Sequence, residues 1–471
     1  PTSYMFNLEF VNETIVQGFI SFDVQNHGRN HMELYGTHGS IIVPDPNMFG
    51  GPVSVSKELG SIWVNHSVEE KPLGKTNIEN HSGRINEAAK QSNYRGIGLS
   101  EMMNYPGVIN CDDEIIKKLE LFSGGHIDGH APQLSGKELN AYIAAGIKTE
   151  HEATSKLEAL EKLQKGMKVL IREGSVSKDL MSLYTIINDK TSPYICFCTD
   201  DRNPLDIDEY GHIDFMIRTL IKMGVSPLNA YRSASLSASE AFGLNDRGII
   251  APGKKADIVI LENLEECKAK SVICGGKVVD EKLFSTVKRV DPIGLNSVKS
   301  KTLKKSDFIS KDKTQKTSII GIIEGKIITE HLHDEIPIVN GDKSPDTVKD
   351  LVRVSVIERY GKNNNIANGF VRGFGLKKGA VASTVAHDHH NIVSIGIDYE
   401  DMAIACNRLK EIKGGFVIAS QGKITAELSL PIAGLMSLES FEIVRDKLTD
   451  LRRSAKDLGI NTEILTNSKI S

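Results

Sequence analysis

Four polar side chains in this 471-residue chain each stand directly after a short apolar run. They are Glu101 after "RGIGLS", His130 after "HIDG", His151 within "GIKTEHEAT", and Asp200 after "YICFCT". In parallel β/α folds the carboxyl ends of the strands meet at one edge, so side chains placed there lie around one common site. Two imidazoles together with carboxylates suit Zn, Mn or Fe. The series therefore predicts a site for a divalent transition metal.

A cation at such a site would polarise water and lower its pKa toward neutrality, which is the basis of metal-assisted hydrolysis. We expect Asp200 to take the released proton and pass it to a leaving group. Asp201 and Arg202 follow directly. Because adjacent side chains in a strand point in opposite directions, one aspartate can serve the metal while the other pairs with Arg202.

Each of these residues also has a structural explanation. His126 and His130 lie four apart in "GGHIDGHAP", and His130 taken alone is better explained as a polar turn residue. The recurrence of such residues at successive strand ends favours the metal site instead. Glu173 is as well explained by an ion pair with Arg172 at a loop as by a chemical role.

The elements that would position these residues begin near residue 100, where apolar strands alternate with amphipathic helices in the manner of parallel β/α units. Residues 4–43 instead alternate strand-like runs and polar turns, which predicts an antiparallel sheet. The expected segments are an N-terminal sheet fragment (1–97), a β/α segment (98–247), a β-subdomain (248–296), a Lys- and Ser-rich linker (297–318) and a C-terminal α/β domain (319–471).

The composition is ordinary for a soluble globular chain, with 40% hydrophobic and 25% charged residues. A formal net charge of -4 gives no general attraction to nucleic acid. No apolar run approaches the roughly 20 residues that cross a bilayer, and the six scattered cysteines are typical of reduced thiols. We therefore expect a cytoplasmic protein without nucleic-acid or membrane partners. The chain starts at Pro1 rather than Met, so we expect it to be incomplete.

Several long motifs occur in order from about residue 98 to the end: "GLSEMMNYPGVI", "IDGHAPQLSGKELNAYIAAGIKTEHEATSKLEALEKLQKGMKVLIREGS", "CTDDRNPLDIDEYGHID", "GIIAPGKKADIVIL", "NGFVRGFGLKKGAVASTVAHDHHNIV" and "LPIAGLMS". This part of the chain resembles the microbial adenine deaminases of the amidohydrolase superfamily. The resemblance implies conversion of adenine and water to hypoxanthine and ammonia, in purine metabolism, by a homo-oligomer. It also implies a binuclear Mn or Fe centre in a (β/α)8 barrel.

The resemblance carries roles onto matching positions of this sequence. Glu101 would be the carboxylate that bridges the metals, His130 and His151 would be imidazole ligands, and Asp200 would be the ligand that shuttles a proton. His126 falls where the family has no required histidine. Substrate-binding roles fall on five residues, of which the last three could equally form a structural turn: Asp201, His212, His387, Asp388 and His390.

The chain departs from the family pattern in ways that put the pocket in doubt. Such barrels carry a His-x-His pair at the end of their first strand, and residues 1–100 supply none in that context. We therefore expect an incomplete (β/α)8 barrel with a partial ligand set, which would impair activity. The pair His331 and His333 is better explained as part of a strand in the later domain. Substitutions relative to the family occur at Glu150, Phe215, Tyr360 and His389.

Residues 1–97 resemble a different family. "SFDVQNHGRNHMELYGTHGSIIVPDPNMFGGPVSV" and "SNYRGIGLSEM" are similar to the C-terminal domain of Gfo/Idh/MocA-type oxidoreductases. No strand is followed by a G-x-G-x-x-G turn, and "RGFGLKKGA" (372–380) has the wrong glycine spacing, so a sugar oxidoreductase is disfavoured. Two alternatives to an adenine deaminase stay open: another amidohydrolase, or a non-catalytic fusion remnant.

Overall fold

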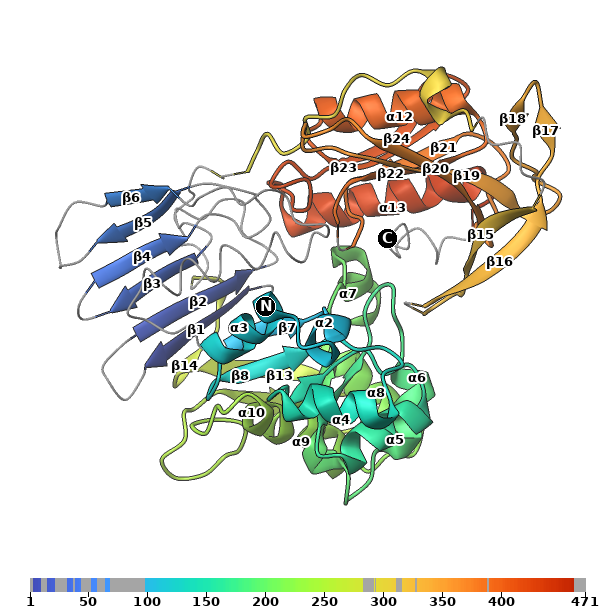
Figure 1. Cartoon of the computed structure of the whole chain (residues 1–471). Helices are drawn as coiled ribbons and strands as arrows, with labels where there is room; N and C mark the ends of the chain where they lie inside the picture. Colours follow the sequence, from blue (N-terminus) through green and yellow to red (C-terminus); the bar gives the residue numbers. More distant parts are fainter. Residues whose placement is uncertain are drawn as a thin grey trace. The chain divides into compact units, whose positions relative to one another are not determined.

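The computed structural model describes residues 98–282, 292, 294–310, 316–326, 328–387 and 389–460, together with the backbone of six earlier strands (Figure 1). The chain divides into two compact units, and each is described by itself. The central unit comprises residues 78–287, and the terminal unit comprises residues 1–77 and 288–471.

A five-stranded sheet organises the central unit, and all of its strand pairs are parallel. Its strand order is β11-β10-β9-β8-β7, so strands that follow one another in sequence lie side by side. The strands are β7 (Gly98–Met102), β8 (His126–Gly129), β9 (Thr149–Glu150), β10 (Lys168–Arg172) and β11 (Ile195–Cys198). The alternation of strand and helix expected from residue 100 onward is therefore confirmed.

Helices connect these strands and cover the sheet. They are α2 (Tyr105–Ile109), α3 (Asp113–Leu121), α4 (Gly136–Ala144), α5 (Lys156–Gln164) and α6 (Leu180–Leu183), followed after β11 by α7 (Pro204–Tyr210), α8 (Ile213–Lys222), α9 (Pro227–Ala234) and α10 (Leu236–Ala241). Three of these helices start with a side-chain cap: the side-chain oxygens of Asn104, Ser155 and Asn203 accept from the amides of Gly107, Glu158 and Asp206.

Successive side chains of β10 enter different hydrophobic clusters, as the pleat requires. Val169 and Ile171 join one cluster with Ile195 and helix residues such as Met216, whereas Leu170 packs in another. The two-sided burial explains why β10 and β11 contain continuous apolar runs rather than an alternating pattern.

A separate antiparallel sheet follows in the central unit. It contains β12 (Ile258–Leu261), β13 (Ala269–Cys274) and β14 (Lys277–Val278).

An eight-stranded mixed sheet organises the terminal unit, in the order β16-β15-β20-β19-β22-β21-β23-β24. These strands are β15 (Lys316–Ile322), β16 (Thr329–Glu335), β19 (Leu351–Ile357), β20 (Ile366–Arg372), β21 (Ala380–Ser383), β22 (Ile392–Gly396), β23 (Gly415–Ser420) and β24 (Lys423–Ser429), with a small hairpin of β17 (Ile338–Val339) and β18 (Asp342–Lys343). Helices α12 (Tyr399–Glu411) and α13 (Phe441–Asp457) lie on opposite faces of this sheet (Figure 1).

The exposed linker expected over 297–318 is wrong for its described part up to residue 310. Val298, Leu303 and Phe308 are buried in the cluster that also contains Met402 of α12. The Asn407 side chain holds this segment, because it accepts from the Leu303 amide and donates to the Leu303 carbonyl. Apolar residues recur about every five positions among the Lys and Ser residues of this segment. This spacing fits neither a helix nor a strand, but the buried residues are enough to anchor the segment.

Every pairing described among the N-terminal strands is antiparallel, which confirms the antiparallel pairing expected over 4–43. β1 (Ser3–Glu9) pairs with β2 (Ile15–Ser21), and β3 (Met32–Gly36), β4 (Gly39–Val43), β5 (Pro52–Ser56) and β6 (Val64–Ser67) form a second sheet.

All six cysteines are free thiols. Within the described ranges, no helix combines the length and the apolar run that crossing a bilayer requires.

Candidate metal centre

Every strand of the parallel sheet ends in, or is closely followed by, a residue that reaches one polar cluster. Glu101 belongs to β7, His130 follows β8, His151 and Glu152 follow β9, Arg172 ends β10, and Asp200 comes two residues after β11. The strands run in the same direction, so their carboxyl ends deliver these side chains to the same edge.

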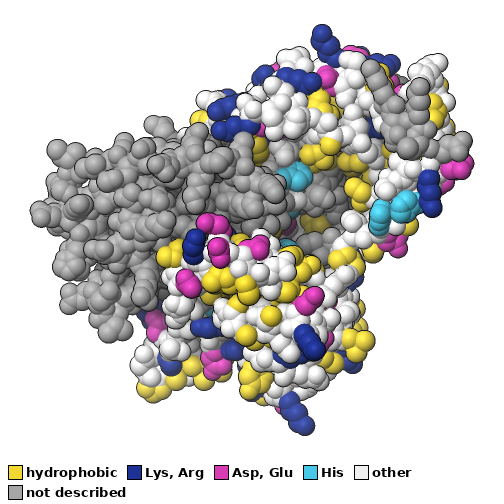
Figure 2. All heavy atoms as spheres, viewed as in Figure 1, with side chains coloured by type: hydrophobic (Ala, Val, Ile, Leu, Met, Phe, Trp, Pro, Cys, Tyr) yellow, Lys and Arg dark blue, Asp and Glu magenta, His cyan; other side chains and the backbone are white. Residues whose placement is uncertain are grey.

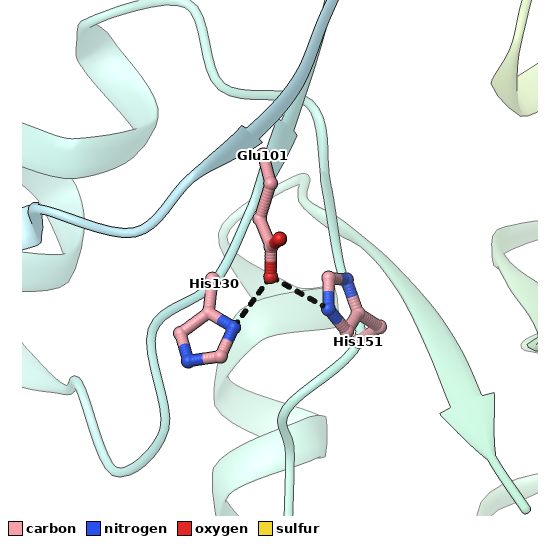
Figure 3. Close-up of side chains that lie close together, drawn as sticks. All are labelled: Glu101, His130 and His151. Carbon is pink, nitrogen blue, oxygen red and sulfur yellow. Dashed lines mark hydrogen bonds and ion pairs between the residues drawn. The ribbon is translucent and has the colours of Figure 1, made fainter. Parts of the chain in front are cut away.

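Three of the residues expected as metal ligands contact one another directly. Oε1 of Glu101 lies 2.6 Å from Nδ1 of His130 and 3.2 Å from Nε2 of His151. Figure 3 shows the Glu101 carboxylate between the two imidazoles, which approach it from neighbouring loops. The ring centroids of His130 and His151 are 5.7 Å apart. The structure therefore brings together Glu101, His130 and His151 although the sequence separates them.

Asp200 reaches the same cluster from the far strand. Its Oδ2 lies 3.9 Å from Nε2 of His151 and accepts a 2.8 Å hydrogen bond from Nη1 of Arg172. Asp200 has a φ of 49°, in the left-handed region that aspartate tolerates better than most residues. This backbone conformation turns its carboxylate back toward the cluster.

Glu152 lies at the base of the cluster and is fully buried. Its Oε1 is 3.4 Å from Nδ1 of His130 and 3.5 Å from Nε2 of His151. The guanidinium of Arg172 binds both oxygens of Glu152, and the bond from Nη2 to Oε2 measures 2.6 Å. Arg172 thus holds Glu152 and Asp200 at once.

A second set of contacts fixes the two imidazoles. Nδ1 of His151 faces Oδ2 of Asp128 at 3.4 Å, and the Thr149 hydroxyl donates to the other oxygen of Asp128. The Tyr142 hydroxyl accepts from the His130 amide at 3.0 Å and donates to the Met102 carbonyl at 2.5 Å. Partners of this kind orient ligating histidines in metal sites.

The charges around the cluster set the pKa values of its members. Burial alone would lower the pKa of His151, but its hydrogen bonds to Asp128 and Glu101 outweigh burial and raise that pKa to about 11. Burial would raise the pKa of Glu101, yet its bonds to His130 and His151 hold it well below the usual range. Burial raises the pKa of Glu152 against the opposing charge of Arg172.

The donor set fits a divalent cation. Among the described residues, two groups have ligand atoms that all lie within 4.8 Å of one another: Glu101 with His130 and His151, and His151 with Glu152 and Asp200. Glu101, Asp128, Glu152 and Asp200 supply four carboxylates to the network, and two of them, Glu152 and Asp200, bind Arg172. Imidazole nitrogen with carboxylate oxygen suits Zn, Mn or Fe.

Glu152 and Arg172 were missed as members of this cluster, although both stand at strand ends. The expected pairing of Arg172 with Glu173 is wrong, because Arg172 binds Glu152 and Asp200 while Glu173 accepts from the Leu180 amide. Arg202 donates to the carbonyls of Gly211 and Glu173, so its pairing with Asp201 stays a prediction.

Three further residues singled out from the sequence belong to the same unit. His126 contacts the Thr149 hydroxyl at 3.0 Å and packs against Phe242. Nε2 of His212 contacts the Thr199 hydroxyl at 2.9 Å, at the start of α8. Asp201 is exposed in the loop after β11.

His387 and His390 belong to the terminal unit, where their rings lie 5.3 Å apart in a turn. The turn is tied down by Tyr360, whose hydroxyl donates to the carbonyls of His389 and His390, and by Arg359. Asp388 lies outside the described residues.

Two family models match the chain. The amidohydrolase family matches residues 39–279, which is more than half of the 471 residues. The adenine deaminase C-terminal domain matches residues 326–469.

Curated relatives match over most of the chain. An adenine deaminase from Cereibacter sphaeroides is 58% identical over 369 residues, which cover 78% of this chain and 65% of the relative. An adenine deaminase from Agrobacterium fabrum is 56% identical over 367 residues, covering 78% and 64%. The chain therefore spans slightly less than two thirds of the length of these relatives.

Solved structures resemble the chain only weakly. N-acetyl-D-glucosamine-6-phosphate deacetylase from Mycobacterium smegmatis is 14% identical with a TM-score of 0.32, over 45% of this chain and 60% of the other. A beta-aspartyl dipeptidase from Fervidobacterium islandicum is 15% identical with a TM-score of 0.31, over 47% and 64%.

Proposed function

The chain belongs to the amidohydrolase family, and we propose that it catalyses the hydrolytic deamination of adenine to hypoxanthine and ammonia. The observation that carries this proposal is the convergence of Glu101, His130 and His151 at the ends of parallel strands. The identity of 58% over 369 residues to a curated adenine deaminase supports the choice of substrate. The match covers 65% of that relative, so the relative's activity is given to this chain as a proposal.

Glu101, His130, His151 and Asp200 would hold the metal ions of a binuclear centre. We propose Mn or Fe, since both accept imidazole and carboxylate ligands. Such a cation supplies Lewis-acid chemistry that lowers the pKa of a water molecule toward neutrality. The proposed ligand set is incomplete because no His-x-His pair occurs in residues 1–100.

Asp200 is the residue that would move the proton. It takes a proton from the water that attacks C6 of adenine and returns it to the amino group, so the C6–O bond forms, the C6–N bond breaks and ammonia leaves. Asp200 ends the step with no net gain or loss of protons. Arg172, which donates to Oδ2 of Asp200, keeps the carboxylate oriented during this transfer.

The purine ring would be bound by polar residues outside the metal cluster. We propose Asp201 and His212 for this role, and the match to the family motifs puts forward His387, Asp388 and His390 in the same way. Their support is the match of these positions to the family motifs "CTDDRNPLDIDEYGHID" and "AHDHHN".

The finer architecture belongs to the same proposal. The parallel sheet within residues 98–247 would be the second half of a (β/α)8 barrel, with a β-subdomain at 248–296 and an adenine deaminase-type domain at 319–471. Residues 1–97 would be a Gfo/Idh/MocA-like fragment, although the amidohydrolase match begins at residue 39. We further propose a cytoplasmic homo-oligomer in purine metabolism, with adenine as its small-molecule substrate.

The test is to purify the full chain, measure its Mn and Fe content, and follow adenine consumption by ultraviolet absorbance and ammonia release. Metal with adenine turnover is the expected result. Dialysis against a chelator should remove the turnover, and Mn or Fe should restore it. Bound metal without adenine turnover would favour another amidohydrolase, and a chain that binds no metal would favour a non-catalytic remnant.

A further inference from the structure

Two histidines of the terminal unit stand side by side on the edge strand of its large sheet. His331 and His333 are both exposed members of β16, and β16 is the first strand in the sheet order. Their ring centroids lie 4.5 Å apart. Figure 2 shows histidine side chains grouped at the surface in the region where Figure 1 draws β15 and β16.

The pleat of β16 places both imidazoles on one face. His331 pairs with Ile320 of β15 and His333 pairs with Ser318, in a continuous antiparallel register. Leu332 between them packs against the buried cluster of Ile319, Ile336, Leu351 and Phe370 on the other face. The core therefore fixes the register that keeps His331 and His333 together in solvent.

The carboxylate of Asp334, next to His333 in sequence, lies on the other face of the strand. Asp334 alternates to the face of Leu332, where it forms ion pairs with Arg372 and Lys349. The two histidines share the Ser318 hydroxyl as a neighbour. Ser318 Oγ lies 3.1 Å from Nε2 of His331 and 3.4 Å from Nε2 of His333, so both nitrogens point to the same small region.

We propose that His331 and His333 form a surface chelate for a divalent transition-metal cation of the Ni²⁺, Cu²⁺ or Zn²⁺ type. Two imidazole nitrogens directed to one point select these cations over Mg²⁺ and Ca²⁺, which require oxygen ligands. The remaining coordination positions face solvent and are open to water. Small rotations of the exposed rings bring both Nε2 atoms to the roughly 2.0 to 2.1 Å that a Zn–N bond needs. This pair of histidines belongs to the terminal unit, and the proposal does not depend on the proposed deamination.

The test titrates Ni²⁺ into the full chain by equilibrium dialysis and compares it with single variants. His331→Gln and His333→Gln should each weaken one binding event by at least about tenfold, since one of two ligands is lost. The matched control is Thr329→Ala, which changes an exposed residue of the same strand and should bind like the unchanged chain. Ni²⁺ bound by the central unit should be the same in the unchanged chain and in the three variants, so it does not affect the difference in binding between them. Identical binding by all four would overturn the proposal.

A measurement on the unchanged chain avoids any effect of the substitutions on folding. Diethylpyrocarbonate acylates accessible imidazoles, and mass spectrometry of peptides reports the extent at each histidine. Zn²⁺ should protect the peptide that contains His331 and His333, whereas Mg²⁺ at the same concentration should not. Equal labelling of this peptide with and without Zn²⁺ would contradict the site.

Discussion

Nη1 of Arg172 lies 2.8 Å from Oδ2 of Asp200, and the same guanidinium binds both oxygens of Glu152. One buried cation therefore fixes two carboxylates that come from different strand ends. The position of Asp200 depends on β10 as well as on its own strand.

Replacing Arg172 by Lys should lower kcat for adenine by about 10- to 100-fold, the usual effect of losing a supporting contact at a metal site. Lysine keeps the charge but cannot bind Glu152 and Asp200 with a planar fork. Metal content and KM should change less than kcat. The control is Arg218→Lys, at a partly exposed pair with Asp214, and it should leave kcat within about twofold. An unchanged kcat in Arg172→Lys would contradict the positioning role.

His130→Ala and Asp200→Ala should each abolish adenine turnover while the far-ultraviolet circular dichroism stays that of the unchanged chain. His130→Ala should also reduce bound metal, because it removes an imidazole from the Glu101 cluster. His126→Gln is the matched control, since His126 lies four residues away and contacts Thr149 rather than Glu101. Normal rates in both alanine variants would exclude the proposed site.

Tyr142→Phe should lower the free energy of unfolding by about 1–3 kcal/mol, because the His130 amide and the Met102 carbonyl both lose their partner in a buried environment. Differential scanning calorimetry measures this as a lower transition temperature. Tyr231→Phe removes a more exposed bond to the Leu264 carbonyl and should have a smaller effect. Equal shifts in the two variants would show that burial of the Tyr142 bonds is not the cause.

The buried side chain of Lys118 should make the free energy of unfolding depend on pH. Burial lowers its pKa from 10.5 to about 8, and the side chain is only 6% exposed. Between pH 8 and 10.5 the unfolded chain binds more protons than the folded chain, so this lysine makes stability rise with pH through that window and destabilises the fold below it.

Lys118→Met should therefore raise the free energy of unfolding at pH 7 by about 1–3 kcal/mol, since each pKa unit corresponds to about 1.4 kcal/mol. It should also flatten the dependence between pH 8 and 10.5. Lys117→Met, at a neighbouring exposed position, should change stability by no more than about 0.5 kcal/mol. A loss of stability in Lys118→Met would show that the ammonium is better accommodated than its burial suggests.

The sequence allowed the parallel strands and the gathering of Glu101, His130 and His151 to be predicted, because both follow from local pattern and from the direction of parallel strands. The partners of Arg172 could not be predicted. Arg172 is adjacent to Glu173 in sequence, but successive residues of an extended chain point apart. Its true partners come from loops whose approach depends on how the whole sheet folds.

The burial of residues 297–310 could not be predicted from the sequence pattern either. Leu303 and Phe308 are spaced by neither 2 nor 3.6 residues, so periodicity gives no sign of burial. Their burial depends on α12, which lies about 100 residues further along and supplies Asn407 as an anchor.

Because each of the five parallel strands contributes a polar residue near its end, this cluster tolerates length changes in some places and not in others. An extra residue in an exposed loop that joins a helix to a strand would leave the cluster intact, because the strands would keep their register. One extra residue inside β10 would turn Arg172 to the opposite side of the sheet, and Glu152 and Asp200 would then lose their shared counter-charge together. Insertions can therefore accumulate in the connections of such a protein, whereas the number of residues in each strand that leads to the cluster must stay the same.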